Sequence, residues 1–377
     1  MNYAVLPIAT RERLPAALAG RHALRDLASA VLPPWKVRAR APLRLGLAGG
    51  GTDLSPYCDE HGGNVLNCTI SLYAYAMVEE RLDWRAVFSA EDIEAQDEVL
   101  PAPDLPVDTG LTLHRAVYNR IVRDFCGGRP LAVTVHTAVD APPGSGLGSS
   151  SALVVAMVKA FAEYLVLPLG DYDIARLAYE IERVDLGMAG GRQDQYAAAF
   201  GGCNFIEFLP GERVVVNPLR VREAHRLELE SSLLVCHTGR SRVSSDIIKQ
   251  QTEGLRRHSE DALAAMHQIK QDAIDMKHHL LRGDIRRVAE VLDRSWAAKK
   301  RSASGVSNDR IDAIYEAALQ AGAWAGKISG AGGGGFLMLL VPPERRPSLA
   351  RRLTAEGLCL LGCGLTNAGA ESWIIPS

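Results

Sequence analysis

The stretch PPGSGLGSSS, residues 142–151, decides the fold of this chain. It follows a β-branched segment, LAVTVHTAV at 131–139, and runs without a break into ALVVAMVKAFAEYL, which predicts a helix. A glycine-rich turn before a helix leaves backbone N–H groups unpaired, and the helix dipole favours negative charge there. This context predicts a phosphate-binding loop. The alternative is a tight turn, capped by serine, with only a structural role.

The loop differs from the common nucleotide-binding motifs. The Walker A pattern GxxxxGK[ST] is absent from the sequence. The segment GAGGGG at 330–335 matches GxGxxG, but a predicted helix leads into it and a predicted strand follows it. A dinucleotide-binding turn needs a strand before it and a helix after it, so this segment is not predicted to bind a dinucleotide. The HRD and DFG segments of protein kinases and the GxSxG of α/β-hydrolases are also absent.

Composition excludes several classes of function. The chain has 377 residues, of which 47% are hydrophobic and 23% are charged, as in a globular protein of two or three domains. Because 42 basic residues face 44 acidic ones, no basic excess indicates nucleic acid as a partner. We find no apolar run of 18 residues and no signal peptide, so we expect no membrane partner and a cytoplasmic protein. We expect its seven scattered cysteines to be reduced.

Three glycine-rich segments occur in order: RAPLRLGLAGGGTD at 40–53, PPGSGLGSSSA at 142–152 and KISGAGGGGF at 327–336. Together they resemble the motifs of the GHMP kinase superfamily, named for galactokinase, homoserine kinase, mevalonate kinase and phosphomevalonate kinase. The resemblance covers residues 36–375. It implies an α+β fold, in which a ribosomal-protein-like domain with a left-handed βαβ unit precedes a ferredoxin-like domain, and ATP lies between them.

The domain limits follow from this resemblance and from the composition. We expect an ATP-binding domain over 36–207 and a second domain over 208–377, since long polar helical segments fill 245–302. The preceding 1–35 is predicted to be a helical extension, with a transit peptide as the alternative.

The resemblance also implies how ATP and a metal bind. Mg²⁺ would be held by a loop serine and a later glutamate, which map best onto Ser150 and Glu182, with Ser149 and Glu180 as alternatives. One hydroxyl and one carboxylate suit Mg²⁺, which keeps several waters. The alternative for Glu182 is an exposed carboxylate paired with Arg183. The predicted ligands of the ATP phosphates are Pro143, Gly144, Ser145, Gly146, Leu147, Gly148, Ser149, Ser150 and Ser151.

Two residues match the catalytic pair of the superfamily. Asp194, in AGGRQDQY at 189–196, matches the catalytic aspartate, which would accept the proton of the attacking hydroxyl. Arg44 matches the arginine that pairs with this aspartate and with the transferred phosphoryl group. A helix N-cap is the alternative for Asp194.

The segments 40–76 and 326–336 resemble the D-glycero-D-manno-heptose 7-phosphate kinase branch. That resemblance implies phosphorylation of the anomeric hydroxyl to the 1,7-bisphosphate, for nucleotide-activated heptose and surface polysaccharide. A phosphorylated sugar needs a second basic site, for which we consider 299–301 and 240–242, although both could be solvated charges. The predicted substrate-binding residues are Gly50, Gly51, Thr52, Asp53, Gly191, Asp194, Arg242, Lys299, Lys300, Arg301, Gly332 and Gly333.

Two other functions stay open at this stage. One is a kinase for an unphosphorylated sugar of the fucose or galactose type, and the other is a non-catalytic sensor of sugar and ATP. The presence of the full catalytic set weighs against the sensor, since fold alone does not determine function. We expect a sugar phosphate and ATP as partners, and the sequence leaves a homodimer open.

Overall fold

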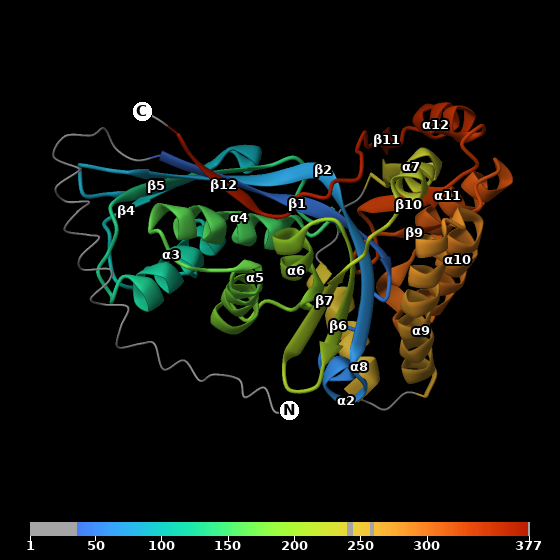
Figure 1. Cartoon of the computed structure of the whole chain (residues 1–377), viewed down its shortest axis with the longest axis horizontal. Coiled ribbons are helices and arrows are strands. Elements are labelled where there is room, and N and C mark those ends of the chain that lie inside the picture. Colours follow the sequence, from blue (N-terminus) through green and yellow to red (C-terminus); the bar gives the residue numbers. More distant parts are fainter. Residues whose placement is uncertain (1–35, 240–243, 257–259, 376–377) are drawn as a thin grey trace.

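The structure of the protein, a computed structural model, describes residues 36–239, 244–256 and 260–375 (Figure 1). The predicted extension over 1–35 lies outside the described residues. So do Arg240 and Arg242, two of the basic residues considered for a substrate phosphate.

An eight-stranded sheet forms the larger half of the molecule. Its strands are β1 (Lys36–Ala48), β2 (Gly63–Glu80), β3 (Ala86–Ala90), β4 (Ala95–Val99), β5 (Val133–Val139), β6 (Cys203–Leu209), β7 (Arg213–Pro218) and β12 (Glu371–Ile375). They lie in the order β12-β1-β2-β5-β3-β4, while β6 pairs with β2 and with β7. The strand pairs are antiparallel except β3 with β5, which are parallel. Because β7 and β12 both lie beyond residue 207, the sheet does not end there, and the domain boundary stays a prediction.

Helices cover one face of this sheet (Figure 1). They are α3 (Thr112–Phe125), α4 (Ser149–Tyr164), α5 (Asp171–Glu180) with the π-helix η2 (Ile181–Asp185), and α6 (Gln193–Phe200). The helix α4 packs on β1 and β2 and also contacts α3, α5 and α6. Being enclosed on all sides, it is apolar around most of its circumference, as the run ALVVAMVKAFAEYL predicts.

A second, four-stranded sheet lies at the other end of the molecule, in the order β11-β8-β10-β9. Its strands are β8 (Leu233–His237), β9 (Ala325–Ile328), β10 (Phe336–Leu340) and β11 (Cys359–Leu360). The helical segments of this half are α7 (Glu223–Ser232), α8 (Ser244–Arg256), α9 (Glu260–Arg282), α10 (Ile285–Ser302), η3 (Ser304–Val306), α11 (Asp309–Gln320) and α12 (Arg346–Ala355). A short helix, α2 (Tyr57–His61), belongs to the first half.

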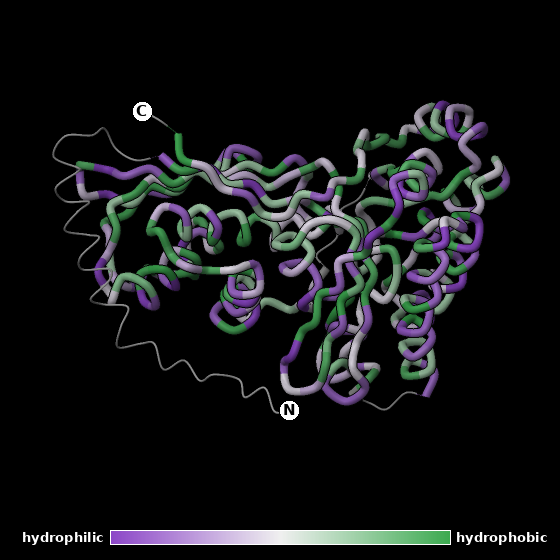
Figure 2. Tube along the Cα trace, in the orientation of Figure 1, coloured by the Kyte–Doolittle hydropathy of each residue, from purple (hydrophilic) through white to green (hydrophobic). Residues whose placement is uncertain are grey.

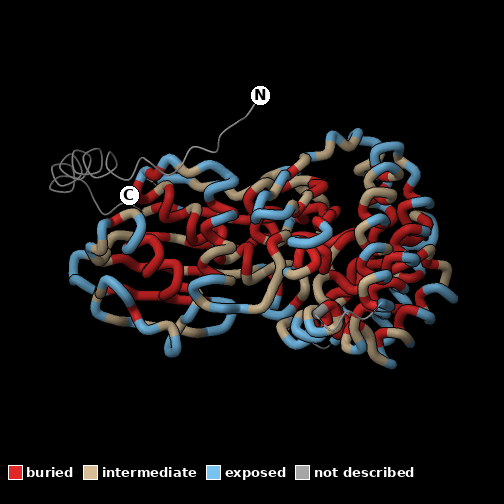
Figure 3. The backbone as a smooth tube through the Cα atoms, turned by 90° about the horizontal axis from the view of Figure 1, so that it is seen from below, coloured by how far each residue is buried: buried red, intermediate tan, exposed pale blue. Residues whose placement is uncertain are grey.

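The pair Gly283-Asp284 predicts a break in the polar helical stretch 245–302, and it separates α9 from α10. Gly283 has a φ of 77°, a left-handed conformation that ends α9. The Asp284 side chain then accepts a hydrogen bond from the Arg287 backbone N–H and caps α10. Hydrophilic residues alternate with hydrophobic ones along α9 and α10 (Figure 2). Buried residues fill the interior of both halves of the molecule, and exposed ones lie at its outer edges (Figure 3). Within the described ranges, no helix is both long and apolar enough to cross a membrane.

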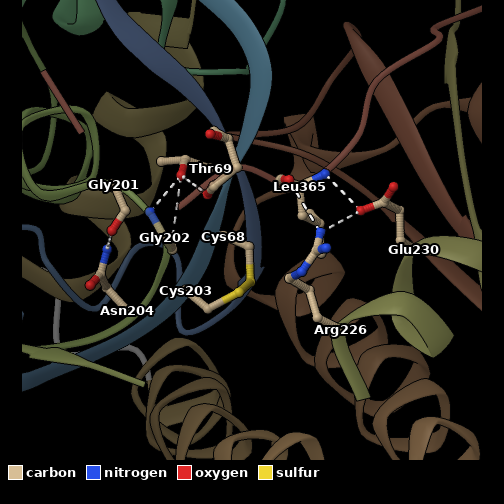
Figure 4. The surroundings of a disulfide bond; sticks show 10 residues. Cys68, Thr69, Gly201, Gly202, Cys203, Asn204, Arg226, Glu230 and Leu365 are labelled. Carbon is tan, nitrogen blue, oxygen red and sulfur yellow. Dashed lines mark hydrogen bonds and ion pairs between the residues drawn. A yellow bond between two sulfur atoms is a disulfide. The ribbon is translucent and has the colours of Figure 1, made fainter. Parts of the chain in front are cut away.

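The expectation that all seven cysteines are reduced is wrong for two of them. Cys68 and Cys203 form a disulfide (Figure 4). They are 135 positions apart in the chain, but they lie directly opposite one another on the antiparallel strands β2 and β6. Only strand register creates this proximity, so the cysteine spacing in the sequence could not reveal it.

Candidate active site

A cavity of about 620 Å³ collects residues from all three glycine-rich motifs. Its walls come from the β1–α2 turn, the loop before α4, the η2–α6 segment, α8, α10 and the loop after β9. Segments as distant in sequence as Gly50 and Gly330 therefore face the same space.

The loop before α4 presents glycine to the cavity and buries its larger side chains. Gly144, Gly146 and Gly148 all have φ angles between 71° and 76° and line the cavity, whereas the side chains of Ser145 and Leu147 are fully buried away from it. A Cβ atom on Gly146 would clash with the carbonyl oxygen of a residue of the third motif, Ser329. Close packing of the second and third motifs therefore requires glycine here. Pro143 and the three serines at 149–151 also line the cavity.

Arg44 links the three motifs. Its Nε and Nη2 atoms lie 2.7 and 2.6 Å from Asp194 Oδ1. Its Nη1 donates to the Gly146 carbonyl at 2.6 Å and to the Ser329 hydroxyl at 3.2 Å. The Arg44 side chain is only 4% exposed, whereas that of Asp194 is 23% exposed and faces the cavity. Asp194 lies in the first turn of α6 but does not cap it, so the N-cap interpretation is not what the geometry shows.

Asp53 holds the start of α6 and thereby helps to place Asp194. Its Oδ2 accepts hydrogen bonds from the Arg192 and Gln193 backbone N–H groups at 2.9 and 3.1 Å. Its Oδ1 accepts from the Gly51 N–H and the Gln193 side chain at 3.1 and 3.2 Å. A carboxylate has about four acceptor positions, and all are taken, so a sugar hydroxyl would have to displace one of these donors.

The neighbours of Asp53 have different roles. A Cβ atom on Gly191 would overlap the Asp53 carboxylate, so glycine is required for this approach. Thr52 does not line the cavity. Its buried hydroxyl donates to the Gly49 and Asn64 carbonyls at 2.8 and 3.0 Å and closes the turn onto β2.

Glu182, and not Glu180, faces the predicted metal site. The Ser150 hydroxyl lies 3.0 Å from Glu182 Oε1, and Gln195 Nε2 donates to Glu182 Oε2 at 2.5 Å. Glu182 does pair with Arg183, at 3.8 Å, but it is 1% exposed, so only the exposure in the alternative interpretation is wrong. Glu180 instead pairs with Arg120 at 2.7 Å, outside the cavity. Ser149 also lines the cavity.

Of the predicted basic cluster on α10, only Lys299 reaches the cavity. It is 3% exposed, and its Nζ donates to the Gly330 carbonyl at 2.6 Å. Burial, together with the nearby Arg44 charge, lowers the pKa of Lys299 to about 8. Lys300 points away and pairs with Asp312 at 3.2 Å, and Arg301 is exposed. Successive helix residues are about 100° apart, so one face of α10 cannot present all three side chains to the site.

The third motif contributes different residues from those predicted. Gly330 and Ala331 line the cavity, whereas Gly332 and Gly333 do not. Gly333 donates its backbone N–H to the Val306 carbonyl at 2.7 Å, and a Cβ atom on Gly332 would crowd Val306. These two glycines therefore pack the loop against η3.

Comparison with known proteins identifies the family of this chain. Residues 112–202 match the family described as GHMP kinases N terminal domain, and residues 276–358 match GHMP kinases C terminal. D-glycero-alpha-D-manno-heptose 7-phosphate kinase of Campylobacter jejuni is 47% identical over 339 residues, which cover 90% of this chain and 99% of that protein. The chain belongs to the GHMP kinase family. The predicted fold class is thereby confirmed.

Two other GHMP kinases are similar to most of this chain. A crystal structure of a D-glycero-D-manno-heptose 1-phosphate kinase from Bacteroides thetaiotaomicron matches with a TM-score of 0.78 and 44% identity, over 90% of this chain and all of that one. The bifunctional fucokinase/GDP-fucose pyrophosphorylase of Arabidopsis thaliana is 26% identical over 86% of this chain, but only over 32% of its own length. As a GHMP kinase, the protein is a phosphotransferase that uses ATP.

Several residues that line the site of this GHMP kinase carried no recognisable pattern in its sequence. Arg183 lines the cavity beside Glu182 and donates to the Gly191 carbonyl at 3.3 Å. Gln193 lines the cavity and donates to Asp53. Its position next to Asp194 was the one feature of the sequence that could have indicated a place in the site. Gln251 on α8 faces the cavity, and its Nε2 donates to Ser302 Oγ on α10 at 2.9 Å. The two residues are 51 positions apart in the chain, so no local pattern in the sequence indicates this contact.

Proposed function

We propose that this GHMP kinase transfers the terminal phosphoryl group of ATP to the anomeric hydroxyl of D-glycero-D-manno-heptose 7-phosphate and forms the 1,7-bisphosphate. The observation that carries the proposal is one cavity lined by the glycine loop, the Arg44–Asp194 pair and Lys299. The choice of sugar is supported by the 47% identity to the Campylobacter jejuni heptose 7-phosphate kinase over nearly its full length. The product would supply nucleotide-activated heptose for surface polysaccharide.

In this proposal Asp194 accepts the proton of the attacking hydroxyl. Arg44 contacts Oδ1 of Asp194 through both Nε and Nη2, which leaves Oδ2 to accept from the substrate. The carboxylate also lies against the loop, since Asp194 Cγ is 3.3 Å from the position of a Cβ atom on Gly148. An acceptor hydroxyl bound to Asp194 is therefore next to the predicted phosphate site, as direct transfer requires.

We propose Ser150 and Glu182 as the protein ligands of Mg²⁺. The two oxygens are 3.0 Å apart, close to the separation of about 2.9 Å between adjacent ligands of an octahedral Mg²⁺ with bonds of about 2.05 Å. Gln195 holds the second carboxylate oxygen and so fixes the direction of the first. Among the described residues no group of three or more His, Cys, Asp or Glu could hold a metal, so most ligands would be phosphate oxygens and water. Bound Mg²⁺ supplies positive charge to the phosphates during transfer.

Lys299 is the cation that we propose for the phosphate of the sugar. It lines the same cavity as Asp194, and its Nζ is 3.6 Å from the position of a Cβ atom on Gly50. An ammonium that is 3% exposed and still faces a cavity can form a strong charge-assisted hydrogen bond with a phosphate. Gln251 and Ser245 line the same part of the wall and offer polar groups to the hydroxyls of the sugar.

A substrate panel tests the proposal. Coupled ADP release would be measured with the heptose 7-phosphate, the heptose 1-phosphate, and free mannose, fucose and galactose, with and without a chelator. Two charge-assisted hydrogen bonds to the sugar phosphate, at about 1.5 kcal/mol each, predict a kcat/KM about 10²-fold higher for the 7-phosphate than for free sugars. Phosphorus NMR of the product would then place the new phosphate on the anomeric oxygen.

Each outcome of the panel has a distinct meaning. Preference for the 1-phosphate would instead indicate the reaction named for the Bacteroides relative and would place the new phosphate at the opposite end of the sugar. Equal turnover of free fucose or galactose would favour a kinase for unphosphorylated sugars. Absence of ADP release with every sugar would leave the sensor interpretation, and full activity with excess chelator would contradict the magnesium assignment.

A further inference from the structure

A buried arginine outside the cavity holds the segment that carries Glu182. Arg120, on α3, is 7% exposed. Its Nε and Nη2 donate to the two oxygens of Asp185, each at 2.8 Å, and its Nη1 donates to Glu180 Oε2 at 2.7 Å. A third carboxylate, Asp124, lies 3.5 Å from Nη1. The guanidinium therefore has charged partners along both of its edges.

The partners of Arg120 mark both ends of the π-helix η2. Glu180 is the last residue of α5 and Asp185 is the last residue of η2, while Glu182 lies between them with its carboxylate toward Ser150. A π-helix is rare, and each one turns the following residues by about 100° relative to an uninterrupted α-helix. The direction in which Glu182 points therefore depends on keeping this irregular turn in place.

We infer that Arg120 is a positioning residue for the metal site. Its hydrogen bonds at the two ends of η2 hold this turn in the conformation in which Glu182 faces Ser150. The inference rests on the proposed role of these two residues in binding Mg²⁺. Arg120 does not line the cavity and touches no substrate atom there. A planar guanidinium suits this function because its donors are fixed relative to one another, whereas a lysine has no such fork.

The same helix provides a matched control. Arg115 is 6% exposed and also forms a two-pronged pair, with Nε and Nη2 at 2.6 and 2.8 Å from the oxygens of Asp97. Its partner lies on β4, and neither residue lines the cavity. Arg115→Met therefore removes an equivalent buried pair of α3 without altering the support of η2.

The test measures metal binding directly. Mn²⁺ would be titrated by electron paramagnetic resonance into the protein with a non-hydrolysable ATP analogue, at a temperature where every variant is folded. Loss of a residue that supports a metal ligand typically weakens the metal about 10–100-fold, so we expect this range for Arg120→Met. Arg115→Met should change Mn²⁺ affinity by less than about twofold. Arg120→Lys should bind Mn²⁺ almost as weakly as Arg120→Met does, because lysine keeps the positive charge but lacks the fixed pair of guanidinium donors. If Arg120→Met does not fold, Asp185→Asn takes its place, since it removes one partner and keeps the arginine.

The variant Glu182→Gln distinguishes a failure of the proposed metal site from a failure of the proposed role of Arg120. If Glu182→Gln binds Mn²⁺ as tightly as the unmodified protein does, the proposed metal site is wrong. If Glu182→Gln weakens Mn²⁺ binding but Arg120→Met weakens it no more than Arg115→Met does, the metal site stands and the role of Arg120 is overturned. The same conclusion against Arg120 follows if both arginine variants weaken the metal equally.

Discussion

Replacing Asp194 by asparagine tests the centre of the proposed mechanism. Asparagine keeps the size of the side chain and an oxygen that can accept from Arg44, but it removes the negative charge and the base. General-base catalysis contributes about 10²–10⁴ in rate, so we expect kcat to fall by that factor, equivalent to about 3–5 kcal/mol of transition-state stabilisation. The affinity for ATP should change little, since the glycine loop is intact.

The structure also sets the expected cost in stability. Arg44 is 4% exposed and keeps its hydrogen bonds to Gly146 and Ser329, but its charge loses its paired carboxylate. Breaking a fully buried pair costs about 3–5 kcal/mol. Asp194 is 23% exposed and asparagine keeps an acceptor, so we expect a smaller loss, about 1–2 kcal/mol in the free energy of unfolding.

Asp97→Asn provides the matched control for this variant. Asp97 also accepts two hydrogen bonds from one arginine fork, at 2.6 and 2.8 Å from Arg115, but lies outside the cavity. Initial rates of coupled ADP release, nucleotide titration and urea unfolding would be compared for the two variants. Asp97→Asn should lose stability and keep kcat. Near-normal kcat in Asp194→Asn, or an equal loss of kcat in Asp97→Asn, would refute the assignment of Asp194 as the base.

Three further predictions concern pH, metal and redox state. Because burial and the Arg44 charge lower the pKa of Lys299 to about 8, its ammonium is charged below pH 8 and neutral above it. The kcat/KM for the phosphorylated sugar should therefore fall about tenfold per pH unit above 8. In Lys299→Met this kcat/KM should be low at all pH values and should not show the decline. A flat pH profile of the unmodified enzyme would contradict the proposed role of Lys299 in binding the sugar phosphate. Ser150→Ala should weaken Mn²⁺ binding with the ATP analogue more than Ser149→Ala does, and the reverse order would shift the register of the metal site by one residue. Thiol titration in denaturant should find two fewer free thiols before reduction than after, from Cys68 and Cys203, and equal numbers would show that no disulfide is present.

Local sequence patterns predicted much of the framework. The alternating segments at 36–48 and 63–80 predict strands, and β1 and β2 have these bounds. The break predicted at 283–284 separates α9 from α10. Strand alternation, helix periodicity and glycine turns are set within a few residues, so the chain shows them before it folds. Some short elements were not predicted: α2 has five residues, and β8 lies in a stretch with no distinct alternation. The apolar spacing of Ile174, Leu177, Ala178, Ile181 and Val184 predicts one helix over about 171–186. Its last part is the π-helix η2, which helix propensity does not distinguish from an α-helix.

From the sequence alone, three ordered glycine motifs indicated the GHMP kinase family and made Arg44 and Asp194 the candidates for the catalytic pair. These conclusions depend on residue type and order, because only glycine permits such backbone turns near a ligand. The tertiary structure was needed to show which of two nearby glutamates, Glu182 or Glu180, lines the cavity, and which residue of the α10 cluster enters it. Neighbouring residues of a helix point about 100° apart, so the choice between Glu182 and Glu180 depends on what the helix packs against. Here that choice comes from Arg120, which is 60 positions away from Glu180 in the chain and in contact with it only after folding.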